Sequence, residues 1–286
     1  MGFTLDSVIT GKEKKPPIIL LYGPQGVGKT EWASQAPGEI FIPCEDGIGT
    51  LDYARFSKPR TFEDVLEAIV ELGSKQHPYK TLVIDTVSAL EKIVHADIRA
   101  AKGDNIFTSF GKGHTLAVGY FDKLTTYLSR LRDSKGMMVI LTAHSDIKRF
   151  EPPESDPYDT YTIRCHEKVQ YKLHDWADMV LFANYKTTVR KFDGEFGQKR
   201  TRGEGDDTRA IYTRRRPAFL AKNRYDLPFE IPLPKEFDWP GFLREVYKGL
   251  ADGRPPEELG KGGFATEGPR APTPDEDEQA AAAAAE

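Results

Sequence analysis

The sequence contains little cysteine and lacks any long apolar run. Two of its 286 residues, Cys44 and Cys165, are cysteines, which excludes a disulfide framework and indicates a reducing compartment. No apolar run approaches the roughly 18 residues that suggest a membrane-spanning helix, and the first residues show no signal-peptide pattern. We therefore expect a cytoplasmic protein that has no membrane partner.

The net charge is small, at −4, so overall charge gives no sign of a nucleic-acid partner. The charge is unevenly distributed, however. Between Lys186 and Arg224 the sequence has twelve Lys or Arg residues against five acidic ones, whereas from Asp252 onward it has nine acidic residues against three basic ones. This asymmetry predicts a basic working face and an acidic tail. The segment 251–286 is rich in Gly, Pro and Ala, and we expect it to be disordered.

Short apolar runs alternate with helical patterns along the first two thirds of the chain. The runs that predict strands are 17–22, 39–42, 81–85, 137–143 and 179–183. The patterns that predict helices are 28–36, 61–72, 87–101, 116–132 and, near the C-terminus, 238–250. This alternation predicts an α/β fold with a mostly parallel central sheet flanked by helices.

After Tyr185 the strand pattern becomes polar, and the Gly-rich stretch 193–207 suggests the loop of a C-terminal β-hairpin region. The expected organisation is an N-terminal extension over 1–15, one core over 16–250 and the tail over 251–286.

The stretch LLYGPQGVGKT contains a complete phosphate-binding loop, Gly23-x4-Gly28-Lys29-Thr30. Its glycines let backbone N–H groups point at phosphates, and the following helix adds positive potential. A dinucleotide-binding fingerprint has a different glycine spacing. Lys29 is expected to bridge the β- and γ-phosphates, and Thr30 to ligate Mg²⁺. The residues expected to contact the nucleotide are Gly23, Pro24, Gln25, Gly26, Val27, Gly28, Lys29, Thr30 and Glu31.

Three further residues follow predicted strands, where side chains line the ligand crevice of an α/β sheet. Asp85 ends the strand TLVID and is the candidate second Mg²⁺ ligand; alternatively it caps the helix after it. Glu45 is the candidate group that orients or deprotonates the attacking water, with Asp46 and Asp52 as alternatives. His144 ends the strand VILTAH and is either a γ-phosphate sensor or a structural histidine.

Several motifs, in order, resemble the RecA/DnaB branch of P-loop ATPases. They are FIPCEDGIGTLDYAR, TLVIDTVSAL, VILTAH and FLAKNRYDLP. The resemblance implies a RecA-like fold, ATP and Mg²⁺ as cofactors, Glu45 as the catalytic glutamate and His144 in the sensor position. It also implies that Lys222 and Arg224 reach the nucleotide of a neighbouring subunit, so that ATP is hydrolysed between copies in a ring or filament.

With FGKGHT and AKNR included, the segment 16–239 is most similar to a bacteriophage family, the Sak-type single-strand annealing ATPases. This resemblance implies an ATP-dependent recombination protein that binds single-stranded DNA in the host-cell cytoplasm, with a single-strand-binding protein as a further candidate partner. Two alternatives are a nucleotide-gated regulatory ATPase that does not bind DNA, and a helicase-like motor. The long N-terminal domain of the recombinases is missing from the sequence, and His144 stands where they usually carry Gln or Asn.

DNA contact is expected in the polar segment 145–168, which we interpret as a linker after the fourth strand. Cations and aromatic residues alternate in it, as sequence-tolerant binding of single strands requires. They are Lys148, Arg149, Arg164 and Lys168, with Phe150, Tyr158 and Tyr161. Four acidic residues in the same segment count against this interpretation: Glu151, Glu154, Asp156 and Asp159. A second basic cluster, 214–216, lies near Lys222.

Overall fold

The structure is a computed structural model that describes residues 8, 15–47, 51–108, 111–193 and 199–248. Most of the expected extension over 1–15 and all of the expected tail over 251–286 lie outside these residues. Their predicted character stays a prediction.

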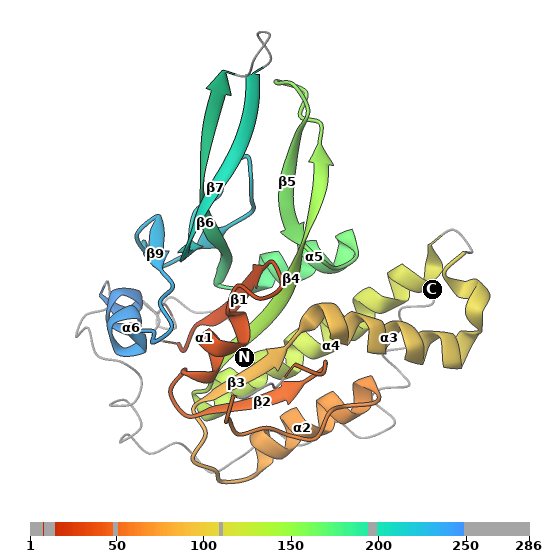
Figure 1. The fold of residues 1–286 in the computed structure, drawn as a ribbon. Helices are drawn as coiled ribbons and strands as arrows, with labels where there is room; N and C mark the ends of the chain where they lie inside the picture. The colour runs from red at the N-terminus through yellow and green to blue at the C-terminus, as the bar shows by residue number, and fades with distance from the viewer. Residues whose placement is uncertain (1–7, 9–14, 48–50, 109–110, 194–198, 249–286) are drawn as a thin grey trace.

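The described residues form a nine-stranded sheet with helices on both faces (Figure 1). The strand order is β2-β3-β4-β1-β6-β7-β9, with β5 paired to β4 and β8 paired to β6. Neighbours from β2 to β6 are parallel, and the remaining pairs are antiparallel. The strands are β1 (Ile18–Gly23), β2 (Glu39–Pro43), β3 (Thr81–Asp85), β4 (Met138–Phe150), β5 (Tyr158–Ile163), β6 (Met179–Asp193), β7 (Lys199–Tyr212), β8 (Lys222–Asn223) and β9 (Glu230–Pro232). The predicted α/β class with a mostly parallel sheet is confirmed.

The helices divide between the two faces of the sheet. Their bounds are α1 (Lys29–Ser34), α2 (Phe62–Ser74), α3 (Val87–Lys102), α4 (Lys112–Lys135), α5 (Glu167–Trp176) and α6 (Trp239–Tyr247), with a 3₁₀ turn η2 (Asp104–Ile106). Ile18 and Leu20 of β1 pack in one core with α2, α3, α4 and α5, while Ile19 and Leu21 pack in a second core with α1 and α6. Because both faces are covered, β1 is buried at every position and its sequence is continuously apolar.

Two long hairpins extend in the same direction from the carboxyl end of the parallel strands (Figure 1). β4 and β5 form one, with 145–150 paired to 158–163, so the segment interpreted as a linker is largely a β-hairpin. β6 and β7 form the other, and β7 takes in most of the Gly-rich stretch read as a loop. The linker interpretation was wrong, because the exposed residues 146–150 of β4 lack the continuous apolar pattern of the parallel strands. The predicted C-terminal β-hairpin region is confirmed, but its loop was placed over too many residues. The sequence analysis also missed α5.

No helix among the described residues has both the length and the apolarity that crossing a bilayer requires.

Candidate nucleotide-binding site

The predicted phosphate loop joins β1 to α1. At two positions in it, the structure shows why the residue is glycine. Gly28 is the N-cap residue of α1 and has a φ of 96°, a left-handed conformation that glycine adopts without strain. Gly23 packs so closely on β6 that a Cβ atom there would lie 2.2 Å from the carbonyl oxygen of Ala183. The loop is therefore shaped both by its own backbone and by the neighbouring strand.

Lys29, the first residue of α1, folds back over the loop. Its side chain is buried, and Nζ donates hydrogen bonds to the carbonyl oxygens of Gly23 at 3.0 Å and Pro24 at 2.8 Å. Burial lowers the pKa of Lys29 to about 8, against the opposing effects of the carboxylates of Asp85 and Glu45. The ammonium group thus lies inside the loop, close to two acidic side chains.

Thr30 and Asp85 come together as the sequence predicted. Thr30 Oγ1 donates to Asp85 Oδ2 at 2.8 Å, and Thr142 of β4 donates to the other carboxylate oxygen. Burial raises the pKa of Asp85, while the hydrogen bonds from Thr142 and Thr30 act in the opposite direction. The alternative role of Asp85 as a helix cap is filled by Thr86, whose side chain accepts from the backbone N–H of Ala89 at the start of α3.

Glu45 and His144 form the second pair at the carboxyl end of the strands. His144 Nε2 lies 3.0 and 3.1 Å from the two carboxylate oxygens of Glu45. This hydrogen bond is the main reason that the pKa of Glu45 is lowered. Of the alternatives, Asp46 forms an ion pair with Lys58 at 2.7 Å and Asp52 is exposed. Of these three acidic residues, Glu45 is the one whose side chain contacts His144 on β4.

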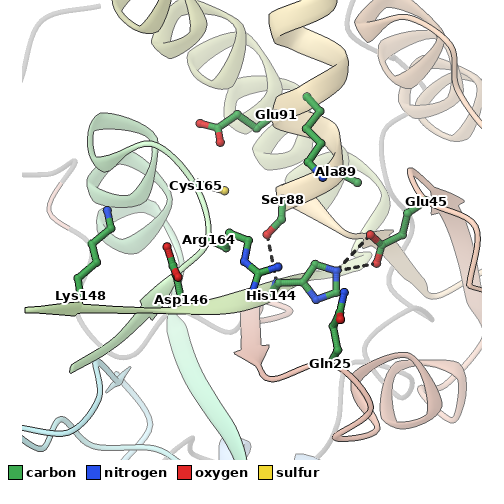
Figure 2. A pocket seen from close by; sticks show the side chains of 11 residues that line it. Gln25, Glu45, Ser88, Ala89, Glu91, His144, Asp146, Lys148, Arg164 and Cys165 are labelled. Atoms are coloured by element: carbon green, nitrogen blue, oxygen red, sulfur yellow. Dashed lines mark hydrogen bonds and ion pairs between the residues drawn. The ribbon is translucent and has the colours of Figure 1, made fainter. Parts of the chain in front are cut away.

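Both members of this pair line a pocket of about 240 Å³ (Figure 2). Gln25 of the phosphate loop and Ser88 of α3 lie on its wall, and Arg164 enters it from the end of the β4–β5 hairpin. Ser88 Oγ also accepts a hydrogen bond from the backbone N–H of His144 at 3.1 Å. The pocket joins the phosphate loop, β2, α3 and the hairpin.

Two residues at the base of the β6–β7 hairpin hold the phosphate loop, and the sequence analysis missed both. Arg209 Nη1 donates to Glu31 Oε2 at 3.0 Å and to the carbonyl oxygen of Val27 at 3.3 Å, and Tyr185 Oη donates to the carbonyl oxygen of Gly26 at 3.0 Å. Glu31, expected to contact the nucleotide, faces Arg209. The excess of basic residues in 186–224 was the only sequence signal, and it singled out no residue.

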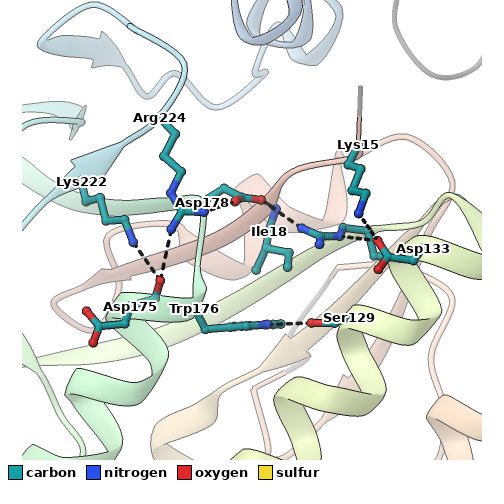
Figure 3. A network of polar contacts seen from close by, with 10 residues as sticks. Lys15, Ile18, Ser129, Asp133, Asp175, Trp176, Asp178, Lys222 and Arg224 are labelled. Atoms are coloured by element: carbon teal, nitrogen blue, oxygen red, sulfur yellow. Dashed lines mark hydrogen bonds and ion pairs between the residues drawn. The ribbon is translucent and has the colours of Figure 1, made fainter. Parts of the chain in front are cut away.

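Lys222 and Arg224 lie at the opposite end of the parallel strands from the phosphate loop (Figure 3). Lys222 Nζ donates to the carbonyl oxygens of His174 at 2.7 Å and Asp175 at 3.1 Å. Arg224 Nη1 donates to Asp178 Oδ1 at 2.9 Å, and Asp178 Oδ2 accepts from the backbone N–H of Ile18, the first residue of β1.

The six residues of β1 span roughly 17 Å at the usual rise of about 3.3 Å per residue. Lys222 and Arg224 therefore do not reach the phosphate loop of their own chain. Their predicted action on a neighbouring subunit stays a prediction.

The residues at the loop fit ATP and Mg²⁺. A hydroxyl and a carboxylate oxygen lie 2.8 Å apart at Thr30 and Asp85, which is the oxygen donor set that Mg²⁺ prefers. Gly26 and Gly28 both have positive φ, and no atom lies within 4 Å of where a Cβ of Gly26 would be, so the loop is open at that point. Lys29 supplies the ammonium.

Comparison with known proteins agrees with this geometry. A protein-family model described as an AAA domain matches residues 15–225. The chain belongs to the AAA-domain family. It is thus a nucleotide-binding P-loop ATPase by family, and nucleotide with Mg²⁺ is the cofactor set that the family implies.

No curated protein matches the AAA-domain chain. Among solved structures, it is similar to a RadB recombinase with 12% identity and a TM-score of 0.43, over 77% of this chain and 89% of that one. A likeness at this level carries no information on activity or partners.

Proposed function

We propose that this AAA-domain protein is an ATP-dependent recombination protein of the phage annealing type, which hydrolyses ATP at contacts between its own copies and binds single-stranded DNA. One observation carries the catalytic part of the proposal. The Thr30–Asp85 pair and the Glu45–His144 pair lie at the same end of the sheet as the phosphate loop, 2.8 Å and 3.0 Å across respectively. Those are the parts that ATP hydrolysis requires.

Each residue has a distinct task in this scheme. Bound ATP and Mg²⁺ supply the phosphoryl group and the charge that activates it toward water. Thr30 and Asp85 would hold the metal, and Lys29 would exchange its carbonyl contacts for phosphate oxygens. Glu45 would orient the attacking water and accept its proton, with His144 fixing the direction of the carboxylate.

The β4–β5 hairpin is the proposed DNA contact. Lys148 and Arg149 are exposed on it, and the rings of Phe150 and Tyr158 lie 5.5 Å apart near its far end. Phe150 is 40% exposed and Ile147 is 56% exposed, so apolar surface is available on this hairpin. Cations for phosphates and exposed rings for base stacking are the elements of sequence-tolerant binding to single strands.

Self-association is part of the proposal because the family resemblance gives Lys222 and Arg224 a role at a neighbour's nucleotide. Since they lie at the opposite end of the strands from the phosphate loop, they act on ATP only if the phosphate loop of another copy lies against them. Such a head-to-tail contact generates a ring or a filament. A single-strand-binding protein is a further proposed partner on the DNA, on the strength of the family resemblance alone.

The test measures ATP turnover and DNA binding on the purified full chain. Single-stranded DNA is expected to raise turnover, and its affinity should fall steeply with salt, because binding to phosphates releases counterions. Glu45→Gln should lower turnover by about 10²–10⁴-fold, the usual contribution of a general base, while retaining ATP and DNA. A double change of Lys148 and Arg149 to Gln should flatten the salt dependence.

Acidic residues on the same hairpin favour one competing function, a nucleotide-gated regulator of a partner protein. Asp146 and Asp159 lie on it, and Glu151 lies 3.5 Å from Arg149 Nε. The regulator is supported if the chain hydrolyses ATP but neither binds single strands at low salt nor responds to them.

A further inference from the structure

Arg164 lies directly across from His144. The register of the β4–β5 hairpin pairs Ser145 with Ile163, and the backbone N–H of Arg164 donates to the carbonyl oxygen of His144 at 2.8 Å. Since paired residues of an antiparallel ladder share a face, Arg164 lies on the face of the hairpin that carries His144. The same face lines the pocket beside the phosphate loop (Figure 2).

Within the described part of the chain, the guanidinium group of Arg164 has no acidic partner. Among the described residues no carboxylate lies within ion-pair distance of it, although Asp146 and Glu45 line the same pocket. Other arginines of the chain are paired: Arg132 with Asp178 and Arg209 with Glu31. Arg164 is exposed and lines the pocket, and its charge is a minor contributor to the lowered pKa of Lys29. An arginine in this position is available to an anion held by the phosphate loop.

The pocket has room for that anion. Its volume of about 240 Å³ corresponds to roughly eight water molecules at the ~30 Å³ that each occupies in the liquid. Gln25 forms the wall on the side of the phosphate loop, and Glu45 and His144 form the wall on the side of the proposed attacking water. A terminal phosphoryl group that reached past Gln25 would lie between these walls.

We propose that Arg164 contacts the γ-phosphate of the ATP bound to its own chain, as a catalytic arginine supplied in cis. This inference rests on the proposed ATP hydrolysis. Bidentate hydrogen bonds from a guanidinium group stabilise the charge that develops on a transferred phosphoryl group. The contact distinguishes ATP from ADP, because only ATP carries the phosphate that Arg164 reaches.

The same face connects this contact with the proposed DNA site. Going outward from His144 and Arg164, it carries Lys148 and then the rings of Phe150 and Tyr158. The hairpin that carries the proposed DNA site therefore also positions Arg164 at its base, so a shift of the hairpin on DNA binding would move Arg164 relative to the nucleotide site.

The experiment compares Arg164→Gln with Arg130→Gln, a matched change at an exposed position of α4. Three quantities are measured: the affinities for ADP and for a non-hydrolysable ATP analogue, the DNA-free turnover of ATP, and the affinity for single-stranded DNA. Arg164→Gln should lower turnover at least about 10²-fold and weaken binding of the analogue but not of ADP. Arg164→Lys should recover only part of the turnover, since lysine restores the charge but cannot donate the paired hydrogen bonds of a guanidinium group. Arg130→Gln should match the wild type.

The outcomes separate this inference from the function on which it rests. If the wild-type chain binds and hydrolyses ATP and Arg164→Gln behaves like Arg130→Gln, the inference is wrong and the proposed function stands. If Arg164→Gln weakens DNA binding and leaves DNA-free turnover unchanged, Arg164 belongs to the DNA site and the inference is again wrong. If the wild-type chain retains no nucleotide, both proposals fail together.

Discussion

The two ends of the parallel strands differ in how a central charged residue is paired. At the amino end, Asp178 accepts hydrogen bonds from the backbone of Ile18 and from the side chains of Arg132 and Arg224 (Figure 3). At the carboxyl end, Arg164 has no acidic partner among the described residues, and the buried Nδ1 of His144 has no hydrogen-bond partner there. Buried polar groups are usually satisfied within a protein, so the carboxyl end is the one arranged for a ligand.

The largest expected effect tests whether Arg224 nevertheless acts on a neighbour. Arg224→Ala should lower ATP turnover by about 10³-fold if its guanidinium stabilises the transferred phosphoryl group of another copy. Lys29→Ala should abolish turnover through loss of its own phosphate contact. When the two inactive proteins are mixed, turnover should reappear, because an intact phosphate loop from one can meet an intact Arg224 from the other. The measurement is turnover against mixing ratio at constant total protein.

The control for the mixing experiment is Lys29→Ala mixed with Asp85→Asn, since both changes damage the same end of the strands and no intact pairing can form. Restored turnover in this control would show that the recovery does not depend on an intact Arg224 meeting an intact phosphate loop. Absence of restoration in the Lys29→Ala and Arg224→Ala mixture would assign Arg224 to the structural network at the amino end. The amino end would then have a structural role only.

A smaller effect is expected on stability. Asp178→Ala leaves Arg132, which is 15% exposed, without its buried carboxylate, and removes the acceptor of the Ile18 backbone N–H. Loss of one partner from a buried pair costs about 3–5 kcal/mol. The free energy of unfolding in urea should fall by that order, whereas Asp175→Asn, at a side chain that is 86% exposed, should change it by less than ~0.5 kcal/mol. Equal effects of the two changes would contradict a structural role for Asp178.

The sequence indicated which residues gather at the carboxyl end of the parallel strands but not the contacts at the amino end, for a physical reason. The phosphate loop and Glu45 come shortly after the buried strands β1 and β2, Asp85 is the last residue of β3, and His144 follows the buried part of β4. Parallel strands bring such positions to one edge of the sheet whatever the rest of the fold does. Local pattern was enough to place these residues at that edge, and the structure brings Thr30 and Asp85 together as the pattern suggested. The pairing of Glu45 with His144 was not predicted.

Contacts between distant segments could not be predicted in this way. Arg209 reaches Val27 across 182 positions of sequence, and Arg224 reaches Asp178 only because β8 pairs with β6. The β4–β5 hairpin was missed because residues 146–150 of β4 are exposed and do not show the continuous apolar pattern by which the parallel strands were found. Arg164 was expected to contact DNA, and only the hairpin register places it opposite His144.

The smallest expected effect concerns buried ring nitrogens without a partner, which also occur away from the nucleotide site. His95 Nε2 and His114 Nδ1 are also buried without a partner among the described residues, yet they lie in a cluster of rings with Phe107 and His166, outside the nucleotide site. Burial is the main cause that lowers the pKa of His95 from 6.5 to about 4, followed by the charges of His114 and Arg99. An unpartnered ring nitrogen is thus compatible with a neutral structural histidine.

If His95 is a neutral structural histidine, it should make the stability of the fold depend on pH but should have no part in ATP turnover. Above pH ~6.5 His95 is neutral in both the folded and unfolded states, whereas between ~6.5 and ~4 only the unfolded chain takes up the proton. The stabilisation that His95 contributes is therefore complete above pH ~6.5 and is lost as the pH falls toward 4. His95→Gln should flatten the fall in the urea midpoint between pH 7 and pH 5 and leave ATP turnover at pH 7 unchanged. A loss of turnover would instead indicate that this ring cluster contributes to activity. The unpartnered nitrogen of His95, like that of His144, would then belong to a functional site.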